Sequence, residues 1–161
     1  MLLALDTRVL RAMRTHGHQP AIERAVAAFS KLGEHSAVWL AIAGAGALAD
    51  PGRRDEWRRA ALVVGAAYVA NQAVKFTVRR PRPRLPDLPQ VVKTPSQRSY
   101  PSAHAATSFA AARTMSGLLP APALYALAVP LALSRPYLGV HYPSDTLAGA
   151  VLGTAVAELA A

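Results

Sequence analysis

The 161-residue sequence contains no cysteine. This absence excludes a disulfide scaffold, a thiol nucleophile, an iron–sulfur centre and a Cys-type zinc site. Charged residues make up only 17% of the chain while 52% is hydrophobic, so the chain is too apolar to be disordered. Carboxylates are scarce: 9 Asp and Glu stand against 18 Lys and Arg, which gives a net charge of +9. With a mean hydropathy of +0.19, this composition predicts a membrane-associated protein that handles an anion, rather than a nucleic-acid binder.

The N-terminal segment is amphipathic. Arginines alternate with apolar side chains at helical spacing through Leu2–Phe29, and Gly17 and Pro20 divide the segment into two short helices. Residues 1–33 are therefore expected to form a helical arm. Such an arm either packs on the surface of a bundle or lies in a membrane interface with its arginines reaching the head groups.

Four long uncharged runs follow the arm, at 36–49, 60–74, 114–134 and 146–157. Pro120 and Pro122 divide the third run into two helices. Three of the runs are short beside the ~20 apolar residues of a spanning helix and the run 114–134 is two helices, so a soluble all-α protein is the alternative. The number of runs and their Ala and Gly content favour a membrane bundle, in which small residues let helices approach.

The predicted fold is an all-α, integral-membrane helical bundle of about five core helices plus the amphipathic arm. It forms a single domain over 1–161, multi-pass in the cell membrane. The core helices are expected at 35–50, 58–75, 102–118, 121–135 and 143–161.

The long irregular segment 76–101 is rich in proline and predicts a functional loop. Lys75 is expected to end the helix before it. Pro81 and Pro83 bias the residues that precede them toward extended conformations, which would fold Arg82 back beside Lys75 to make a cationic pocket. A solvated basic loop, or a patch for lipid head groups, is the alternative. The loop also carries basic residues without an assigned role: Arg79, Arg80, Arg84 and Arg98.

Two more motifs stand at predicted helix starts. Pro101-Ser102-Ala103-His104 opens an Ala-rich helix, whose free N–H groups can bind an anion. An N-cap serine beside an incidental histidine is the alternative.

The last motif runs from Ser134 to Asp145. Arg135 supplies a fork that matches phosphate. Pro143 is expected to begin the last helix, which places Asp145 in its first turn near His141. A carboxylate that holds one imidazole nitrogen leaves the other nucleophilic. A purely structural His–Asp hydrogen bond is the alternative.

All these residues fall at one end of the bundle if the helices alternate in direction. Two histidines, one carboxylate, three separated cations and a helix N-terminus are the groups that in-line phosphoryl transfer requires.

Three spaced motifs carry a family resemblance. They are Lys75-(six residues)-Arg82-Pro83, then Pro101-Ser102-Ala103-His104, then Ser134-Arg135-(five residues)-His141-(three residues)-Asp145. Together they resemble the three-part signature of the type 2 phosphatidic acid phosphatase family. The family pattern usually has glycine where Ala103 stands. The added methyl group narrows the approach to phosphate, and we do not expect it to abolish activity.

The resemblance implies a role for each matched residue. His141 is implied to be the nucleophile that forms a phosphohistidine, with Asp145 holding it. His104 is implied to protonate the leaving oxygen and then to activate water. The implied phosphate ligands are Lys75, Arg82, Ser102, the Ala103 amide and Arg135. The family needs no metal or other cofactor, and the sequence offers no carboxylate cluster for Mg²⁺.

The expected partner is a membrane lipid phosphate in a bilayer, not nucleic acid. Gly33-Glu34-His35-Ser36 and Thr94-Pro95-Ser96 resemble an actinobacterial branch of the family that acts on decaprenylphosphoryl-5-phosphoribose, an arabinogalactan precursor. Undecaprenyl diphosphate and phosphatidic acid are alternative substrates. A vanadate-dependent haloperoxidase and a non-enzymatic anion-binding membrane module are alternative functions. Glu34 and His35 are interpreted as a helix cap rather than as a polar extension of the site.

Overall fold

The computed structural model describes residues 2–161. Within them, α-helices and two 3-10 turns make up the regular structure, and an isolated bridge between Pro81 and Arg98 is the only β pairing. The all-α prediction is confirmed. The elements in chain order are α1 (Leu2–Thr15), α2 (Pro20–Ser30), η1 (Lys31–Ser36), α3 (Ala37–Ala49), η2 (Pro51–Arg53), α4 (Arg54–Val78), α5 (Ala103–Met115), α6 (Ala121–Tyr137) and α7 (Pro143–Leu159).

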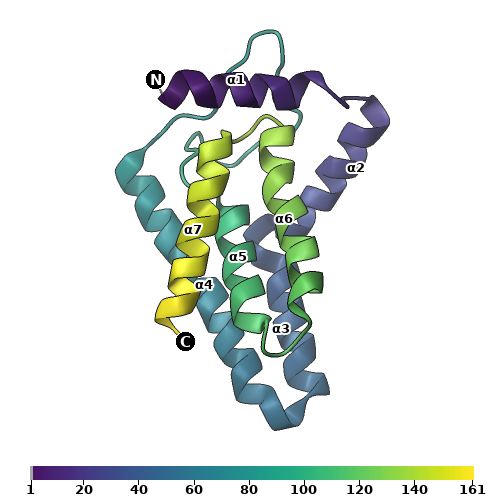
Figure 1. Cartoon of the computed structure of the whole chain (residues 1–161), viewed down its shortest axis with the longest axis vertical. Helices are drawn as coiled ribbons and strands as arrows, with labels where there is room; N and C mark the ends of the chain where they lie inside the picture. The colour runs from purple at the N-terminus through teal and green to yellow at the C-terminus, as the bar shows by residue number, and fades with distance from the viewer. Residues whose placement is uncertain (1) are drawn as a thin grey trace.

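Helices α3 to α7 form an elongated bundle, and α1 lies across one end of it (Figure 1). Helix α5 contacts α4, α6 and α7 and is the central helix of the bundle. Most of its side chains are buried, and they are small, as in Ala105, Ala106 and Ala110. Helices α4, α6 and α7 therefore pack around a central helix of small residues.

Glycines on α7 bring that helix into backbone contact with α5. A Cβ atom at Gly153 would lie 1.9 Å from the Ala106 carbonyl oxygen, and one at Gly149 would lie 2.4 Å from the Ser102 carbonyl oxygen. Both distances are far below van der Waals contact, so neither position accepts a side chain without the helices moving apart. This contact confirms the predicted small-residue packing, and it fixes the start of α7 against the start of α5.

The helix bounds differ from the expected ones by one or two residues at α3, α6 and α7 and by more at α4 and α5. Helix α4 begins before 58, with Asp55 and Glu56 in the first turn, where the helix dipole favours carboxylates. The expectation that Lys75 ends this helix is wrong, since α4 continues to Val78. It ends at Arg79, whose φ of +54° is left-handed and whose N–H donates to the Lys75 carbonyl at 3.3 Å. Helix α5 begins at Ala103 and ends at Met115, inside the expected 102–118.

The outer surface of the bundle is apolar. Large side chains on α3, α4 and α7 are more than 60% exposed, namely Leu48, Leu62, Val69, Leu147 and Val151. Apolar exposure on this scale suits contact with lipid. Among the described residues, one helix is long and apolar enough to cross a membrane, formed by η2 and α4 (Pro51–Val78).

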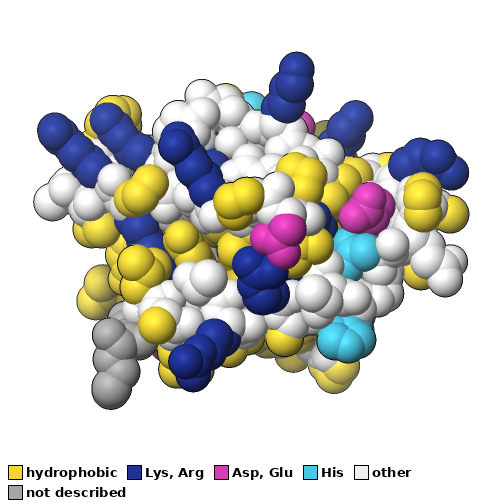
Figure 2. Space-filling view, turned by 90° about the horizontal axis from the view of Figure 1, so that it is seen from above, with side chains coloured by type: hydrophobic (Ala, Val, Ile, Leu, Met, Phe, Trp, Pro, Cys, Tyr) yellow, Lys and Arg dark blue, Asp and Glu magenta, His cyan; other side chains and the backbone are white. Residues whose placement is uncertain are grey.

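The end of the bundle under α1 has a different character. Figure 2 shows that basic side chains are spread over this end and that acidic ones are few. The basic loop between α4 and α5 lies at the same end (Figure 1). Basic residues are thus concentrated at the end of the bundle that contains the predicted site.

Candidate active site

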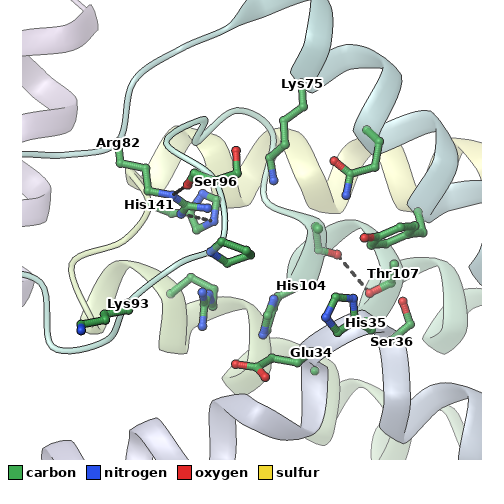
Figure 3. A pocket seen from close by; sticks show the side chains of 16 residues that line it. Glu34, His35, Ser36, Lys75, Arg82, Lys93, Ser96, His104, Thr107 and His141 are labelled. Carbon is green, nitrogen blue, oxygen red and sulfur yellow. Dashed lines mark hydrogen bonds between the residues drawn. The ribbon is translucent and has the colours of Figure 1, made fainter.

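A cavity of about 330 Å³ lies among η1, the ends of α4, α5 and α6, and the loop between α4 and α5. The predicted residues that line it are Lys75, Arg82, Ala103, His104, Arg135 and His141. Ser102 and Asp145 are fully buried and do not line it. The expected fold-back of Arg82 toward Lys75 is confirmed, because both side chains border this one space (Figure 3).

The hydrogen bond of His141 with Arg82 fixes its tautomer. Arg82 Nη1 lies 3.1 Å from His141 Nε2. A guanidinium has only donors, so Nε2 must be the acceptor and a neutral ring carries its proton on Nδ1. Burial, and after it the charges of Arg82, Arg135 and Lys75, lower the pKa of His141 well below its ordinary value. His141 is therefore neutral near pH 7 and has a lone pair on Nε2.

Asp145 lies on the other side of the His141 ring. Its Oδ2 is 3.6 Å from His141 Nδ1 and accepts a 2.8 Å hydrogen bond from the Tyr142 backbone N–H. The separation from Nδ1 exceeds hydrogen-bond length, and Nδ1 is buried without a hydrogen-bond partner among residues 2–161. Catalytic hydrogen bonds are often long in ligand-free sites and shorten when substrate binds.

Three buried cations form one wall of the cavity. Arg82 is held by the carbonyls of Ser96 and Val140, at 2.7 and 2.6 Å. Burial lowers the pKa of Arg82 to about 10, so it remains charged at neutral pH. Lys75 points from α4 into the space that His141 and His104 border (Figure 3). Arg135 donates to Ser30, and its buried Nε makes no hydrogen bond to a described residue. We call Lys75, Arg82, Arg135, His104 and His141 the phosphate wall.

Ser30, at the end of α2, supports two residues of this wall, and the sequence reasoning missed it. Its carbonyl accepts a hydrogen bond from His104 Nε2 at 3.0 Å, and its Oγ accepts one from Arg135 Nη1 at 2.7 Å. A carbonyl only accepts, so the Nε2 proton of His104 is engaged and Nδ1 is the nitrogen left to exchange a proton. Gly33 lets η1 pack on the same ring, because a Cβ there would lie 2.6 Å from His104 Cδ2. No sequence signal marks Ser30, which ends an ordinary amphipathic helix.

Ser102 occupies the N-cap position of α5 but makes no side-chain capping bond. Its Oγ is buried without a partner among the described residues, and its N–H donates to the Asp145 carbonyl at 2.9 Å. The bond to Asp145 joins the start of α5 to the start of α7. Ala103, at the first turn of α5, borders the cavity directly.

A second wall of the cavity is polar and carries less charge. It is formed by Glu34, His35, Tyr68 and Gln72, and we call it the polar wall. The helix-cap interpretation of Glu34 and His35 is wrong, because α3 has Ser36 as its N-cap and no side-chain capping bond. His35 and Ser36 have φ of +50° and +63°, a left-handed conformation that costs non-glycine residues about 1–3 kcal/mol. The side chains of the polar wall make no hydrogen bond to one another or to any other described residue.

The loop arginines without an assigned role, Arg79, Arg80, Arg84 and Arg98, do not line the cavity. Arg79 bonds to the Phe76 carbonyl, and Arg98 stacks 4.4 Å above the Phe76 ring. Arg80 donates a hydrogen bond to Asp145, which also lies outside the cavity. Lys93, which the motif analysis did not select, borders the cavity.

Comparisons with known proteins agree with this geometry. The model of the PAP2 superfamily matches residues 56–161. The chain is 47% identical over 137 residues to the decaprenylphosphoryl-5-phosphoribose phosphatase of Mycolicibacterium smegmatis, with 81% of this chain and 73% of that protein covered. It is 44% identical over 145 residues to the protein of that name from Mycobacterium tuberculosis, with 88% and 80% covered.

A solved structure shows the same fold. The transmembrane PAP2-type phosphatidylglycerolphosphate phosphatase from Bacillus subtilis is 26% identical and superposes with a TM-score of 0.78, over 99% of this chain and 84% of that one. The relatives named above are phosphatases, which supports the phosphatase prediction over the haloperoxidase alternative.

Proposed function

The chain belongs to the PAP2 superfamily and is a membrane phosphatase, and we propose that it removes the 5-phosphate from decaprenylphosphoryl-5-phosphoribose. The observation that carries this proposal is the presence of two unlike walls in one cavity. A wall of buried cations suits a phosphate, and the polar wall suits the hydroxyl groups of a sugar. The names of the two mycobacterial relatives support the same substrate.

The proposed reaction begins with His141 Nε2. Its lone pair attacks phosphorus, and the bond between phosphorus and the ribose O5 breaks. Arg82 now donates to that nitrogen at 3.1 Å, and it would move its hydrogen bond to a phosphoryl oxygen as the N–P bond forms. Asp145 would accept the Nδ1 proton in a hydrogen bond and stabilise the positive charge that the ring gains.

His104 is proposed to handle the protons. Its Nδ1, when protonated, would donate to the departing O5, because Nε2 is held by the Ser30 carbonyl. The same nitrogen would then take a proton from water as the water oxygen attacks the phosphohistidine. This step releases inorganic phosphate and restores His141. Lys75, Arg82 and Arg135, with the Ala103 N–H and the Ser102 hydroxyl, are the proposed ligands of the phosphoryl oxygens.

The polar wall distinguishes among lipid phosphates. A ribose ring offers hydroxyl groups that can donate to Glu34 and exchange hydrogen bonds with Gln72, whereas the glycerol backbone of phosphatidic acid is esterified and has no hydroxyl to offer. A cavity of about 330 Å³ is within the ~300–1,000 Å³ range of small-ligand sites, which leaves room for a sugar beside the phosphate.

We propose further that α3 to α7 each cross the membrane, with the cavity at one surface. The absence of cysteine makes this simple to test. Single cysteines at Gly52 and Gly117 would stand in the α3–α4 and α5–α6 connections, where a Cβ meets no backbone. A membrane-impermeant maleimide should label both from one side and a cysteine at the exposed Lys93 from the other. Labelling of all three from one side would contradict the multi-pass arrangement.

A substrate panel tests the proposed function. The purified protein in detergent would be assayed for phosphate release from decaprenylphosphoryl-5-phosphoribose, undecaprenyl diphosphate and phosphatidic acid, with His141→Ala as the blank. We expect the highest kcat/KM for the phosphoribose lipid. A higher kcat/KM for either of the other lipids would reject the proposed substrate and keep the phosphatase assignment.

A further inference from the structure

A buried charge network lies behind the His141 ring, outside the cavity. Arg80 stands between two carboxylates: Nη2 donates to Asp6 Oδ2 at 2.7 Å and Nη1 donates to Asp145 Oδ1 at 2.7 Å. Asp6 belongs to α1, far from the catalytic motifs in sequence. We propose that Asp6 and Arg80 are positioning residues, which hold the Asp145 carboxylate in the orientation that faces His141. This inference rests on the proposed role of His141.

The two oxygens of Asp145 are divided between two tasks. Oδ1 is occupied by Arg80, while Oδ2 accepts from the Tyr142 N–H and faces His141 Nδ1. A carboxylate held at one oxygen by a charged fork cannot rotate without losing that bond. Asp145 is fully buried, so rotation would leave its charge without a partner, which is costly. Arg80 thereby fixes the orientation in which the carboxylate faces the imidazole.

Asp6 holds Arg80 and the first turn of α7 at the same time. Its carboxylate accepts from the Ser144 N–H at 3.0 Å and from the Ser144 hydroxyl, besides Arg80. Burial by itself would raise the pKa of Asp6, but the hydrogen bonds from Ser144 and Arg80 hold it below its ordinary value. Arg80 also stacks 4.1 Å above the Tyr142 ring. The network therefore holds Tyr142 and Ser144, which lie between His141 and Asp145 in the sequence.

Attachment of α1 does not depend on Asp6 alone. Arg11 pairs with Asp87, and Arg14 donates to the carbonyls of Pro89 and Tyr137 at 2.8 and 2.9 Å. None of these bonds touches Asp145 or His141. A buried ion pair is a weak source of stability, because apolar packing serves as well. The position of the Asp6–Arg80 pair against the catalytic carboxylate is thus better explained by positioning than by anchoring.

Matched substitutions separate the two roles. Asp6→Asn and Arg80→Gln break the network, and Asp87→Asn breaks another ion pair of the same helix without reaching the site. Loss of a residue that orients a metal ligand typically costs 10- to 100-fold in activity, and by analogy we expect Arg80→Gln to lower kcat by about 10- to 100-fold. Asp6→Asn should lower it by a smaller factor, because Asp6 reaches Asp145 only through Arg80. KM should change little, because the phosphate ligands are intact. Arg80→Lys should recover part of the loss, and Asp87→Asn should match the wild type.

The pH profile of kcat/KM falls at low pH, and we call this fall the acid limb. A merely structural role of Arg80 would not change the pH at which it occurs. The charged and titratable groups facing His141 are Lys75 from α4, His104 from α5, Arg135 from α6, Asp145 from α7 and Arg82 from the loop. When Arg80 is replaced, its positive charge no longer offsets the negative charge of Asp145. The carboxylate then favours the protonated form of His141 and raises its pKa. The acid limb should then move to higher pH in Arg80→Gln and stay in place in Asp87→Asn.

The Nδ1 side of the His141 ring can be observed without turnover. In protein labelled with ¹⁵N-histidine, the His141 signals, assigned by their loss in His141→Ala, should show Nδ1–H in the wild type and in Arg80→Gln, because Arg82 donates to Nε2 in both. The Nδ1–H chemical shift should differ in Arg80→Gln, because the Asp145 carboxylate that faces Nδ1 is no longer held. A wild type inactive on every lipid of the panel would reject the proposed function, while this spectrum would still test the positioning. Asp6→Asn and Arg80→Gln variants with wild-type kcat, acid limb and Nδ1–H chemical shift would overturn the inference.

Discussion

The phosphate wall and the polar wall face one cavity but are built differently. Side chains of the phosphate wall are buried and come from the ends of the bundle helices and the connections beside them. Most are held by other protein groups, as Arg135 is held by Ser30. The polar wall includes exposed side chains of η1, and its backbone is in a strained, left-handed conformation at His35. Rigid, pre-oriented groups are suited to stabilising the charge that develops in a transition state. Unpaired polar groups suit selection among ligands.

This contrast predicts two kinds of mutant. Changes in the phosphate wall should slow the reaction for every substrate, since all substrates share the phosphate. Changes in the polar wall should alter the preference among substrates and leave the shared chemistry intact.

The largest effect is expected from His141→Ala. It removes the proposed nucleophile, and losses on removal of a nucleophile are large, here at least about 10³-fold in kcat. The loss should be the same for every lipid in the panel. Circular dichroism and melting temperature should remain near wild type, which separates loss of chemistry from loss of fold. Retention of more than a few per cent of the rate would exclude His141 as the nucleophile.

A smaller loss is expected from Arg135→Lys. Lysine keeps the charge but loses the fork that reaches Ser30 and the phosphate together. We expect kcat/KM to fall by roughly 10²-fold, as for other donors to a transition-state oxyanion. Arg113→Lys is the matched control, because Arg113 is an exposed arginine paired with Glu158 on the bundle surface. Equal kinetics for the two variants would show that a charge alone suffices at 135.

The pH profile should shift when a cation beside His141 is removed. Neutral His141 is the reactive form, and burial and then Arg82 lower its pKa. The wild-type acid limb should therefore lie below pH 6.5, and Arg82→Gln should move it upward while lowering the rate. The exposed Arg84→Gln is the control, and substrate ionisation is common to all three proteins. An acid limb that stays in place in Arg82→Gln would contradict the electrostatic account.

A substitution in the polar wall should change selectivity. Glu34→Gln should lower kcat/KM for the phosphoribose lipid by about 10-fold, the scale of one charged hydrogen bond. Hydrolysis of phosphatidic acid should not change. Glu56→Gln, at an exposed glutamate in the first turn of α4, is the control. A uniform loss across both lipids would place Glu34 in the common chemistry instead.

No effect is expected from metal removal. Among residues 2–161, no group of three or more His, Asp or Glu side chains is placed to hold a metal ion. Activity should survive dialysis against EDTA, and vanadate should inhibit competitively. Loss of activity with rescue by Mg²⁺ would contradict the mechanism.

The motif residues were predictable because their spacing is short and local. Pro143 sets the start of α7, and Asp145 then falls one helical turn after His141. The same is true of His104 in the first turn of α5. The supporting residues were not predictable, because their partners are distant in sequence. Ser30 meets His104 across 74 positions, and Asp6 meets Arg80 across the same separation. Nothing local distinguishes such a serine or aspartate from a surface residue.

Helix bounds show the same limit. The sequence predicted where prolines divide helices, as at Pro20 and Pro120, because proline acts on its own neighbours. It misplaced the end of α4, because the helix ends through a left-handed Arg79 and not through a glycine or proline.

The covalent intermediate on His141 is the central claim, and a single-turnover quench tests it most directly. Excess protein would be mixed with ³²P-labelled phosphoribose lipid, quenched with alkali over a series of times, and digested for peptide mapping. We predict an acid-labile, alkali-stable phosphoryl group on the peptide that contains His141, which forms and decays within one turnover. Label on any other residue, or complete phosphate release with no labelled protein at any time, would contradict the account.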